Sequence, residues 1–305
     1  MRSLSWRGNC FRLEPDREIW TKRRSWHILS TVRDVVQALL VLLANRQRGA
    51  LATVVRTSGS TPQRPGARLL LREDGSTLGT VGGGAIEHAV LESLQRALVS
   101  RASELLIRDL AHDLGMCCGG RMEIFVEPIL PTPRLWLLGA GHVAKPTATL
   151  ARSVGFEVIV VDEREELNSA ERFPDCRRIL GDPGTELRRE NLGDGDWVLI
   201  MTHDHQLDEA ALAAVAGKNA QYVGLVGSKR KVFRLVERVR EKRSGDFPLE
   251  RVYAPVGLDI GAVSPEEIAV SIVAELVALR HGQPAPHLSA LSDVRLQHAL
   301  QRQIT

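Results

Sequence analysis

The feature that most constrains the fold of this chain is an apolar run, residues 135–138, that leads directly into the spacing Gly-x-Gly-x-x-Ala. Gly139 would allow a tight turn, Gly141 would let a pyrophosphate reach a helix N-terminus, and Ala144 would permit close packing of helix on strand. A second apolar run ends at Asp162, where an acid would accept hydrogen bonds from ribose hydroxyls. Strand, glycines, helix and terminal acid together predict a Rossmann-type unit, although a glycine triplet alone would be weak evidence.

The ligand of that unit is less constrained than its fold, because one fold serves many functions. Arg164 follows Asp162 by two positions and could contact a 2′-phosphate. The sequence therefore leaves both NAD and NADP open as nucleotides.

The order of apolar runs divides the chain into two domains. From residue 131 to 282, short apolar runs alternate with helical stretches, which is typical of a parallel sheet with crossover helices. The strands expected there are residues 135–138, 157–161, 178–180, 197–201, 222–226 and 252–253. We therefore predict an α/β protein in which a Rossmann-like, doubly wound parallel sheet follows a smaller α+β domain.

The smaller domain, residues 30–130, has a different pattern. Its expected elements are helices at about 31–45 and 85–101, and strands at about 50–55, 67–72 and 121–128. Residues 1–29 form a basic tail that we expect to be disordered, and residues 283–305 form a polar C-terminal tail.

The positive charge of the chain belongs to its first residues. Residues 1–26 contain seven Lys and Arg against three Asp and Glu, and because the whole chain has a formal net charge of +3, the remainder sums to −1. No basic stripe for nucleic acid is therefore expected. The longest apolar run, residues 35–44, is roughly half of a membrane span. Four cysteines make no disulfide framework, which indicates a reduced, cytoplasmic protein.

Two of those cysteines, Cys117 and Cys118, are adjacent and have glycines on both sides. A disulfide between neighbours would strain the intervening peptide, and the spacing is too short for the Cys-x-x-Cys half of a zinc site. The flanking glycines would let a ligand approach the sulfurs closely. The sequence thus leaves two interpretations: a loop that presents thiolates to a ligand, or two small buried apolar residues.

Polar residues follow two later strands, at the edge where such sheets bind ligands. The segment from Thr202 to His205, with Asp208 beyond it, contains either metal ligands or a helix N-cap with a strand-end polar network, and we favour the N-cap. Gly227, Ser228 and Lys229 enter a helix and suit an anion or phosphate at its N-terminus. A solvated basic first turn is the alternative interpretation of that segment.

Taken together, these segments resemble the xanthine dehydrogenase accessory (XdhC/CoxI) family of molybdenum-cofactor maturation proteins. The resemblance covers about residues 32–282, in family order. The matching stretches are residues 58–62 (Ser-Gly-Ser-Thr-Pro), 79–87, 115–120, 139–144, 162–164, 171–174 (Glu-Arg-Phe-Pro), 202–205, 224–229 and 255–261.

The resemblance implies a function that composition and spacing do not reach. It implies a cytoplasmic chaperone that binds and protects molybdenum cofactor, as molybdopterin or a dinucleotide form, and does not turn over a substrate. Its implied partners are a cysteine desulfurase that installs a terminal sulfur and an apo molybdenum hydroxylase of the xanthine, aldehyde or carbon monoxide dehydrogenase type. We also expect a homodimer, with no nucleic-acid or membrane partner.

The resemblance ties a cysteine of the Cys-Cys-Gly-Gly loop to cofactor binding, and the chemistry of other motifs suits the same cofactor. Cys117 or Cys118 would contact the molybdenum, since thiolates suit a soft metal centre. Backbone amides and cations at helix N-termini would hold phosphate or a nucleotide extension. The residues expected to bind the cofactor in this way are Gly82, Gly83, Gly84, Gly139, Gly141, His142, Asp162, Gly227, Ser228 and Lys229.

Other functions compete with the chaperone. An NAD(P)-dependent oxidoreductase ranks second, with NAD(P) bound to the Rossmann unit, but the first domain shows no obvious acid–base pair. A nucleotide-sensing regulatory module would need no reactive cysteine. A zinc or iron hydrolase using His203, Asp204 and His205 lacks a convincing distant third ligand.

Overall fold

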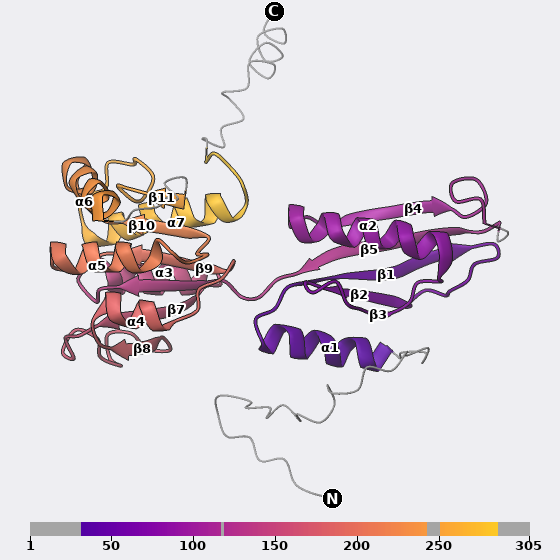
Figure 1. Ribbon diagram of the computed structural model, residues 1–305, viewed down its shortest axis with the longest axis horizontal. Helices are drawn as coiled ribbons and strands as arrows, with labels where there is room; N and C mark the ends of the chain where they lie inside the picture. The colour runs from indigo at the N-terminus through magenta and orange to yellow at the C-terminus, as the bar shows by residue number, and fades with distance from the viewer. Residues whose placement is uncertain (1–31, 117–118, 243–250, 286–305) are drawn as a thin grey trace, which may run out of the picture. The chain divides into compact units, whose positions relative to one another are not determined.

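The computed structural model of the chain describes residues 32–116, 119–242 and 251–285 (Figure 1). The chain divides into two compact units, Met1–Leu130 and Pro131–Thr305. The expected disordered tail, Cys117 and Cys118, and most of the C-terminal tail lie outside the described residues. Among the described helices, none combines the length and the apolar character that a membrane span needs.

The first unit is built on a five-stranded antiparallel sheet with the strand order β3-β2-β1-β5-β4. The strands are β1 (Gly49–Ser58), β2 (Arg68–Arg72), β3 (Thr77–Gly79), β4 (Glu104–Asp109) and β5 (Arg121–Ile129). The long central strands β1 and β5 pair along their whole length, apart from a register shift between Val54 and Arg56.

Helices α1 (Val32–Ala44) and α2 (Gly84–Ser100) lie on opposite faces of this sheet, as Figure 1 shows. Side chains alternate between the faces of a strand, so Ala50 and Ala52 of β1 pack with α2, whereas Leu51 packs with α1. The alternation of side chains along the strands thus supplies an apolar layer on each face of the sheet. Each layer packs against the apolar side of one helix.

Strands β3 and β4 are both absent from the expected elements of the first unit, and β4 is the longer of the two. Only Leu106 of its six residues is buried, while Leu105 and Ile107 are exposed. The strand lies at the edge of the sheet and pairs with β5 through its backbone. Backbone pairing leaves no pattern in the side chains, so the sequence does not predict it.

The second unit is a six-stranded sheet in which every neighbouring pair is parallel. Its order is β8-β7-β6-β9-β10-β11, which in chain order reads 3-2-1-4-5-6, the strand order of the doubly wound dinucleotide fold. The strands are β6 (Arg134–Leu138), β7 (Glu157–Asp162), β8 (Arg177–Leu180), β9 (Asp196–Ile200), β10 (Tyr222–Leu225) and β11 (Val252–Tyr253). The predicted fold class is confirmed.

Helices cover both faces of the second sheet. Helices α4 (Pro183–Arg189), α5 (His205–Val215) and α6 (Lys229–Lys242) pack on the face that contains Trp136 and Leu138. Helices α3 (Ala144–Ser153) and α7 (Pro265–Arg280) pack on the face that contains Leu135 and Leu137. Burial on both faces explains why these strands read as continuous apolar runs.

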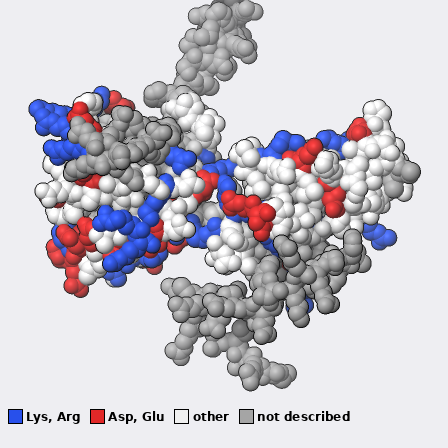
Figure 2. Space-filling model, in the orientation of Figure 1, with Lys and Arg blue, Asp and Glu red and all other residues white. Residues whose placement is uncertain are grey.

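The two units differ in the surface charge that they show on one face. On the face drawn in Figure 2, basic and acidic side chains are interspersed over the second unit, while uncharged residues dominate the first. Because opposite charges are interspersed over the second unit, they produce no electrostatic field of a single sign on that face.

Candidate functional site

The first half of the candidate site is the loop between β6 and α3, at the point where the strand order of the second sheet reverses. Gly139 has a φ of 116°. A Cβ atom on this residue would come within 2.5 Å of the Met201 carbonyl oxygen, just beyond the end of β9. Ala144, the first residue of α3, is fully buried. The first glycine thus lets two strand ends approach each other, and the small third residue lets the helix pack closely.

Gly141 has different surroundings. A Cβ atom on it would find no described atom within 4 Å. It lies on the approach to α3, whose N-cap residue Val143 is aliphatic and cannot cap the helix with its side chain. His142 beside it is exposed. Open space in front of helix amides is what a phosphate group needs.

Asp162, the expected ribose acceptor at the end of β7, already has several partners within the chain. Its Oδ2 atom accepts from the Ala140 amide at 2.6 Å and from Arg164 Nη2 at 2.7 Å. Its Oδ1 atom accepts from the Arg164 amide and from Arg164 Nε, both at 2.9 Å. Burial alone would raise the pKa of Asp162, but the hydrogen bonds from Arg164 and the two amides outweigh it and lower the pKa.

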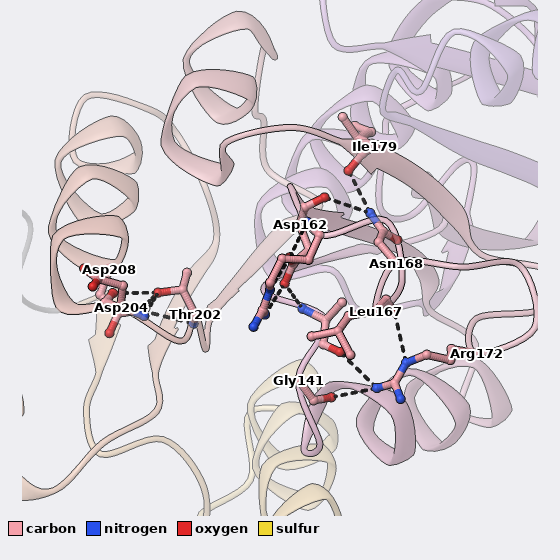
Figure 3. Close-up of polar contacts among 11 residues, drawn as sticks. Gly141, Asp162, Leu167, Asn168, Arg172, Ile179, Thr202, Asp204 and Asp208 are labelled. Carbon is pink, nitrogen blue, oxygen red and sulfur yellow. Dashed lines mark hydrogen bonds and ion pairs between the residues drawn. The ribbon is translucent and has the colours of Figure 1, made fainter.

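Arg172 is a residue of this site that sequence reasoning missed. Its Nε atom donates to the Leu167 carbonyl at 2.9 Å, and its Nη2 atom donates to the Ala140 carbonyl at 3.0 Å and to the Gly141 carbonyl at 3.5 Å (Figure 3). The guanidinium thus ties the glycine loop to the segment after β7. Arg172 belongs to the Glu-Arg-Phe-Pro stretch of the family resemblance, which is the one signal that could have pointed to it.

At the end of β9 the helix N-cap interpretation is confirmed. Asp204 caps α5 by accepting from the Gln206 amide at 2.6 Å, and Thr202 donates to Asp208 at 2.6 Å (Figure 3). The buried Asp208 carboxylate also pairs with Lys231 at 2.7 Å. Within the described ranges, no group of three or more His, Cys, Asp or Glu side chains is arranged to hold a metal ion.

The segment after β10 that we expect to bind an anion leads into a helix as predicted, since α6 starts at Lys229. Ser228 Oγ accepts from the Lys231 amide at 3.3 Å, and Lys229 itself is exposed. The hydroxyl therefore acts as a cap within the chain. Binding of an anion by Gly227, Ser228 and Lys229 stays a prediction.

In the first unit, three of the motifs that carry the resemblance meet at one end of the sheet. A Cβ on Gly59 would lie 3.2 Å from Gly120 Cα, and one on Gly120 would collide with the Ser60 carbonyl oxygen. A Cβ on Gly82 would lie 2.5 Å from Pro62 Cγ. The 58–62 loop therefore packs directly on Gly120 and on the glycine run before α2.

The glycine run before α2 also has partners within the chain. Glu87 Oε2 accepts from Thr80 Oγ1 at 2.5 Å and from the Gly83 amide at 3.1 Å, and the Gly82 amide donates to Thr80. A phosphate here would have to displace a carboxylate. The role of Gly82, Gly83 and Gly84 in binding an anion therefore also stays a prediction, as does the role of the two cysteines.

Comparison with known families finds two matches that follow one another along the chain. Residues 42–108 match the XdhC and CoxI family, and residues 135–276 match the XdhC Rossmann domain. The first match covers most of the first unit, and the second covers β6 through most of α7.

Three curated relatives are similar over most of the chain. The uncharacterized protein YqeB of Escherichia coli (strain K12) is 36% identical over 77% of this chain, which spans only 44% of YqeB. A probable subunit of xanthine dehydrogenase from Bacillus subtilis (strain 168) is 27% identical over 78% of this chain and 95% of its own length. The molybdenum cofactor insertion chaperone PaoD of Escherichia coli (strain K12) is 21% identical over 86% of this chain and 93% of its own length.

Proposed function

Because the chain belongs to the XdhC and CoxI family, we propose that it carries molybdenum cofactor and inserts it into a molybdenum hydroxylase. The name of one relative, a molybdenum cofactor insertion chaperone, supports this role, and so does the name of another, a probable subunit of xanthine dehydrogenase. The observation that carries the proposal is the meeting of three motifs, residues 58–62, Gly82 and Gly120, at one end of the first unit.

The described residues at this end suit a large planar ligand. Some glycines there are packed against neighbouring loops, whereas a Cβ on Gly83, Gly84 or Gly119 would meet no described atom within 4 Å. Packed glycines draw the loops together, and open glycines leave the backbone accessible. The cofactor's own dithiolene already chelates its molybdenum, so the carrier needs only one or two soft ligands, for which we propose Cys117 or Cys118.

In this proposal the chain does not turn over a substrate. It holds the cofactor as cargo, keeps water from it and presents it first to a cysteine desulfurase for sulfuration and then to the apo hydroxylase. Such a carrier must bind its cargo tightly enough to protect it and loosely enough to release it. The client would be of the xanthine, aldehyde or carbon monoxide dehydrogenase type.

The content of the purified protein tests this proposal. The full chain, isolated from a molybdenum-replete host, should contain molybdenum and release oxidised pterin in similar molar amounts. The double variant Cys117→Ala, Cys118→Ala should lose at least about 90% of both the molybdenum and the pterin. Removal of the soft ligands should lower the affinity for the cofactor by about tenfold or more. Cys176→Ala is the matched control, because Cys176 is a half-buried free thiol in the second unit.

Two outcomes would contradict the proposal. Retention of molybdenum by the double variant would show that the two cysteines are not ligands of the metal. Absence of both metal and pterin from the wild-type chain, together with tightly bound NAD(P), would favour the oxidoreductase, for which Gly139, Gly141 and the strand order of the second unit supply a suitable fold.

A further inference from the structure

The carboxylate expected to bind ribose in the second unit already accepts hydrogen bonds from other groups of the same chain. Asp162 accepts four hydrogen bonds, two from backbone amides and two from the Arg164 guanidinium, and its side chain is 3% exposed. A nucleotide that offers only ribose hydroxyls would have to displace Arg164 to reach it. Exchanging Arg164 for ribose hydroxyls is unfavourable, because it replaces a bidentate pair of opposite charges by hydrogen bonds in which only the carboxylate is charged.

Arg164 itself still has capacity for a ligand. Its bonds to Asp162 use two of the five guanidinium N–H groups, and its side chain is 26% exposed. A phosphate monoester carries almost two negative charges at neutral pH and matches the geometry of a guanidinium. Such a group could bind Arg164 without disturbing the bond from the Ala140 amide to Asp162.

We propose that Arg164 is the specificity-determining residue of the ligand site in the second unit. It closes the Asp162 carboxylate to ribose hydroxyls and selects ligands that bring a phosphate monoester. This inference goes beyond the proposed function, because it concerns the second unit alone and would hold for a carrier or an oxidoreductase.

The surrounding charges do not reverse this assignment. Glu163, Glu165 and Glu166 are exposed on the same segment and would repel a phosphate. Charges in solvent are strongly screened at physiological salt, whereas a phosphate on Arg164 would be in direct contact. Arg172 adds a second guanidinium behind the glycine loop, bonded to the carbonyl of the same Ala140 whose amide binds Asp162. The contact proposed for Arg164 therefore outweighs the screened repulsion from the exposed glutamates.

Two sources could supply the phosphate monoester: the 2′-phosphate of NADP and the terminal phosphate of the pterin. Calorimetric titration of the full-length chain with two matched pairs distinguishes them. One pair is NADP⁺ and NAD⁺, and the other is the oxidised pterin monophosphate released from the cofactor and the same pterin after phosphatase treatment. The wild-type chain should bind the phosphorylated member of at least one pair about tenfold or more tightly than its partner.

The variant Arg164→Leu should lose that preference and bind NAD⁺ more tightly than the wild type does, because Asp162 becomes free to accept ribose hydroxyls. A gain of affinity cannot come from misfolding. Arg164→Lys should keep part of the preference, and Arg189→Leu removes an exposed arginine of the same unit as a control. Equal affinities within both pairs, tighter binding of NAD⁺ by the wild type, no binding of any probe, or a preference that survives in Arg164→Leu would each overturn the proposal.

Discussion

At the scale of single residues, the second unit shows that the type of a residue does not fix what it binds. Asp162 occupies the position of a ribose acceptor, yet its carboxylate joins the glycine loop at Ala140 to Arg164. Arg172 fixes the same loop from the carbonyl side. These contacts hold the loop in one shape before any ligand arrives, which lowers the ordering cost of binding.

The lowered pKa of Asp162 predicts how its contribution to stability depends on pH. Its pKa in the folded chain lies below the ordinary value of 3.8, so the ionised carboxylate stabilises the fold above that value and the stabilisation is lost as the pH falls through the folded pKa. Asp162→Asn should lower the free energy of unfolding of the second unit by about 2 kcal/mol at pH 7. Urea unfolding should show this difference begin to shrink as the pH falls below about 5 and continue to shrink until the pH lies below the folded pKa of Asp162.

Asp175→Asn provides the comparison, because the Asp175 carboxylate is 73% exposed in its pair with Arg152. That variant should change the unfolding free energy by less than about 1 kcal/mol. A loss in Asp162→Asn that is equally large at low pH would show that packing, and not charge, is responsible.

At the scale of elements, the loop between β6 and α3 combines two glycines with different tasks. Gly139 is pressed against the end of β9, and Gly141 faces open space in front of α3. The first position serves the fold, and we propose that the second serves a ligand. A substitution at each should therefore separate stability from binding.

Gly139→Ala should be strongly destabilising, because its φ of 116° and the Met201 carbonyl at 2.5 Å both exclude a methyl group. We expect a loss of about 3 kcal/mol or more, measured by thermal or urea unfolding of the second unit. Gly141→Ala should stay within about 0.5 kcal/mol of the wild type and weaken the binding of a phosphate-bearing nucleotide. Normal stability of Gly139→Ala would contradict the assigned packing.

Sequence patterns predict the elements better than the contacts between them. Apolar runs and the glycine spacing predict the second sheet, because burial on both faces leaves long runs of apolar residues. The exposed edge strand β4 and the bonds of Glu87, Arg164 and Arg172 could not be predicted. Strand β4 is held by backbone pairing, which leaves no mark on the sequence. The other bonds depend on a geometry that the spacing of residues along the chain does not determine.

At the scale of the whole molecule, each unit contributes a candidate site of a different kind. The first unit brings together the glycine loops at one end of an antiparallel sheet, and the second presents helix amides and a guanidinium at a strand-order switch. The proposed cargo contains both a soft metal centre and a phosphate.

Delivery of the cargo tests this account most directly. The full-length chain, loaded with sulfurated cofactor, is mixed with an excess of an apo xanthine dehydrogenase-type hydroxylase, and the hydroxylase activity gained per mole of pterin is measured. We predict activation close to one active site per loaded chain, well above that obtained from the same amount of free cofactor. Activation no greater than that from free cofactor, or retention of the pterin by the loaded chain, would contradict the role of a carrier.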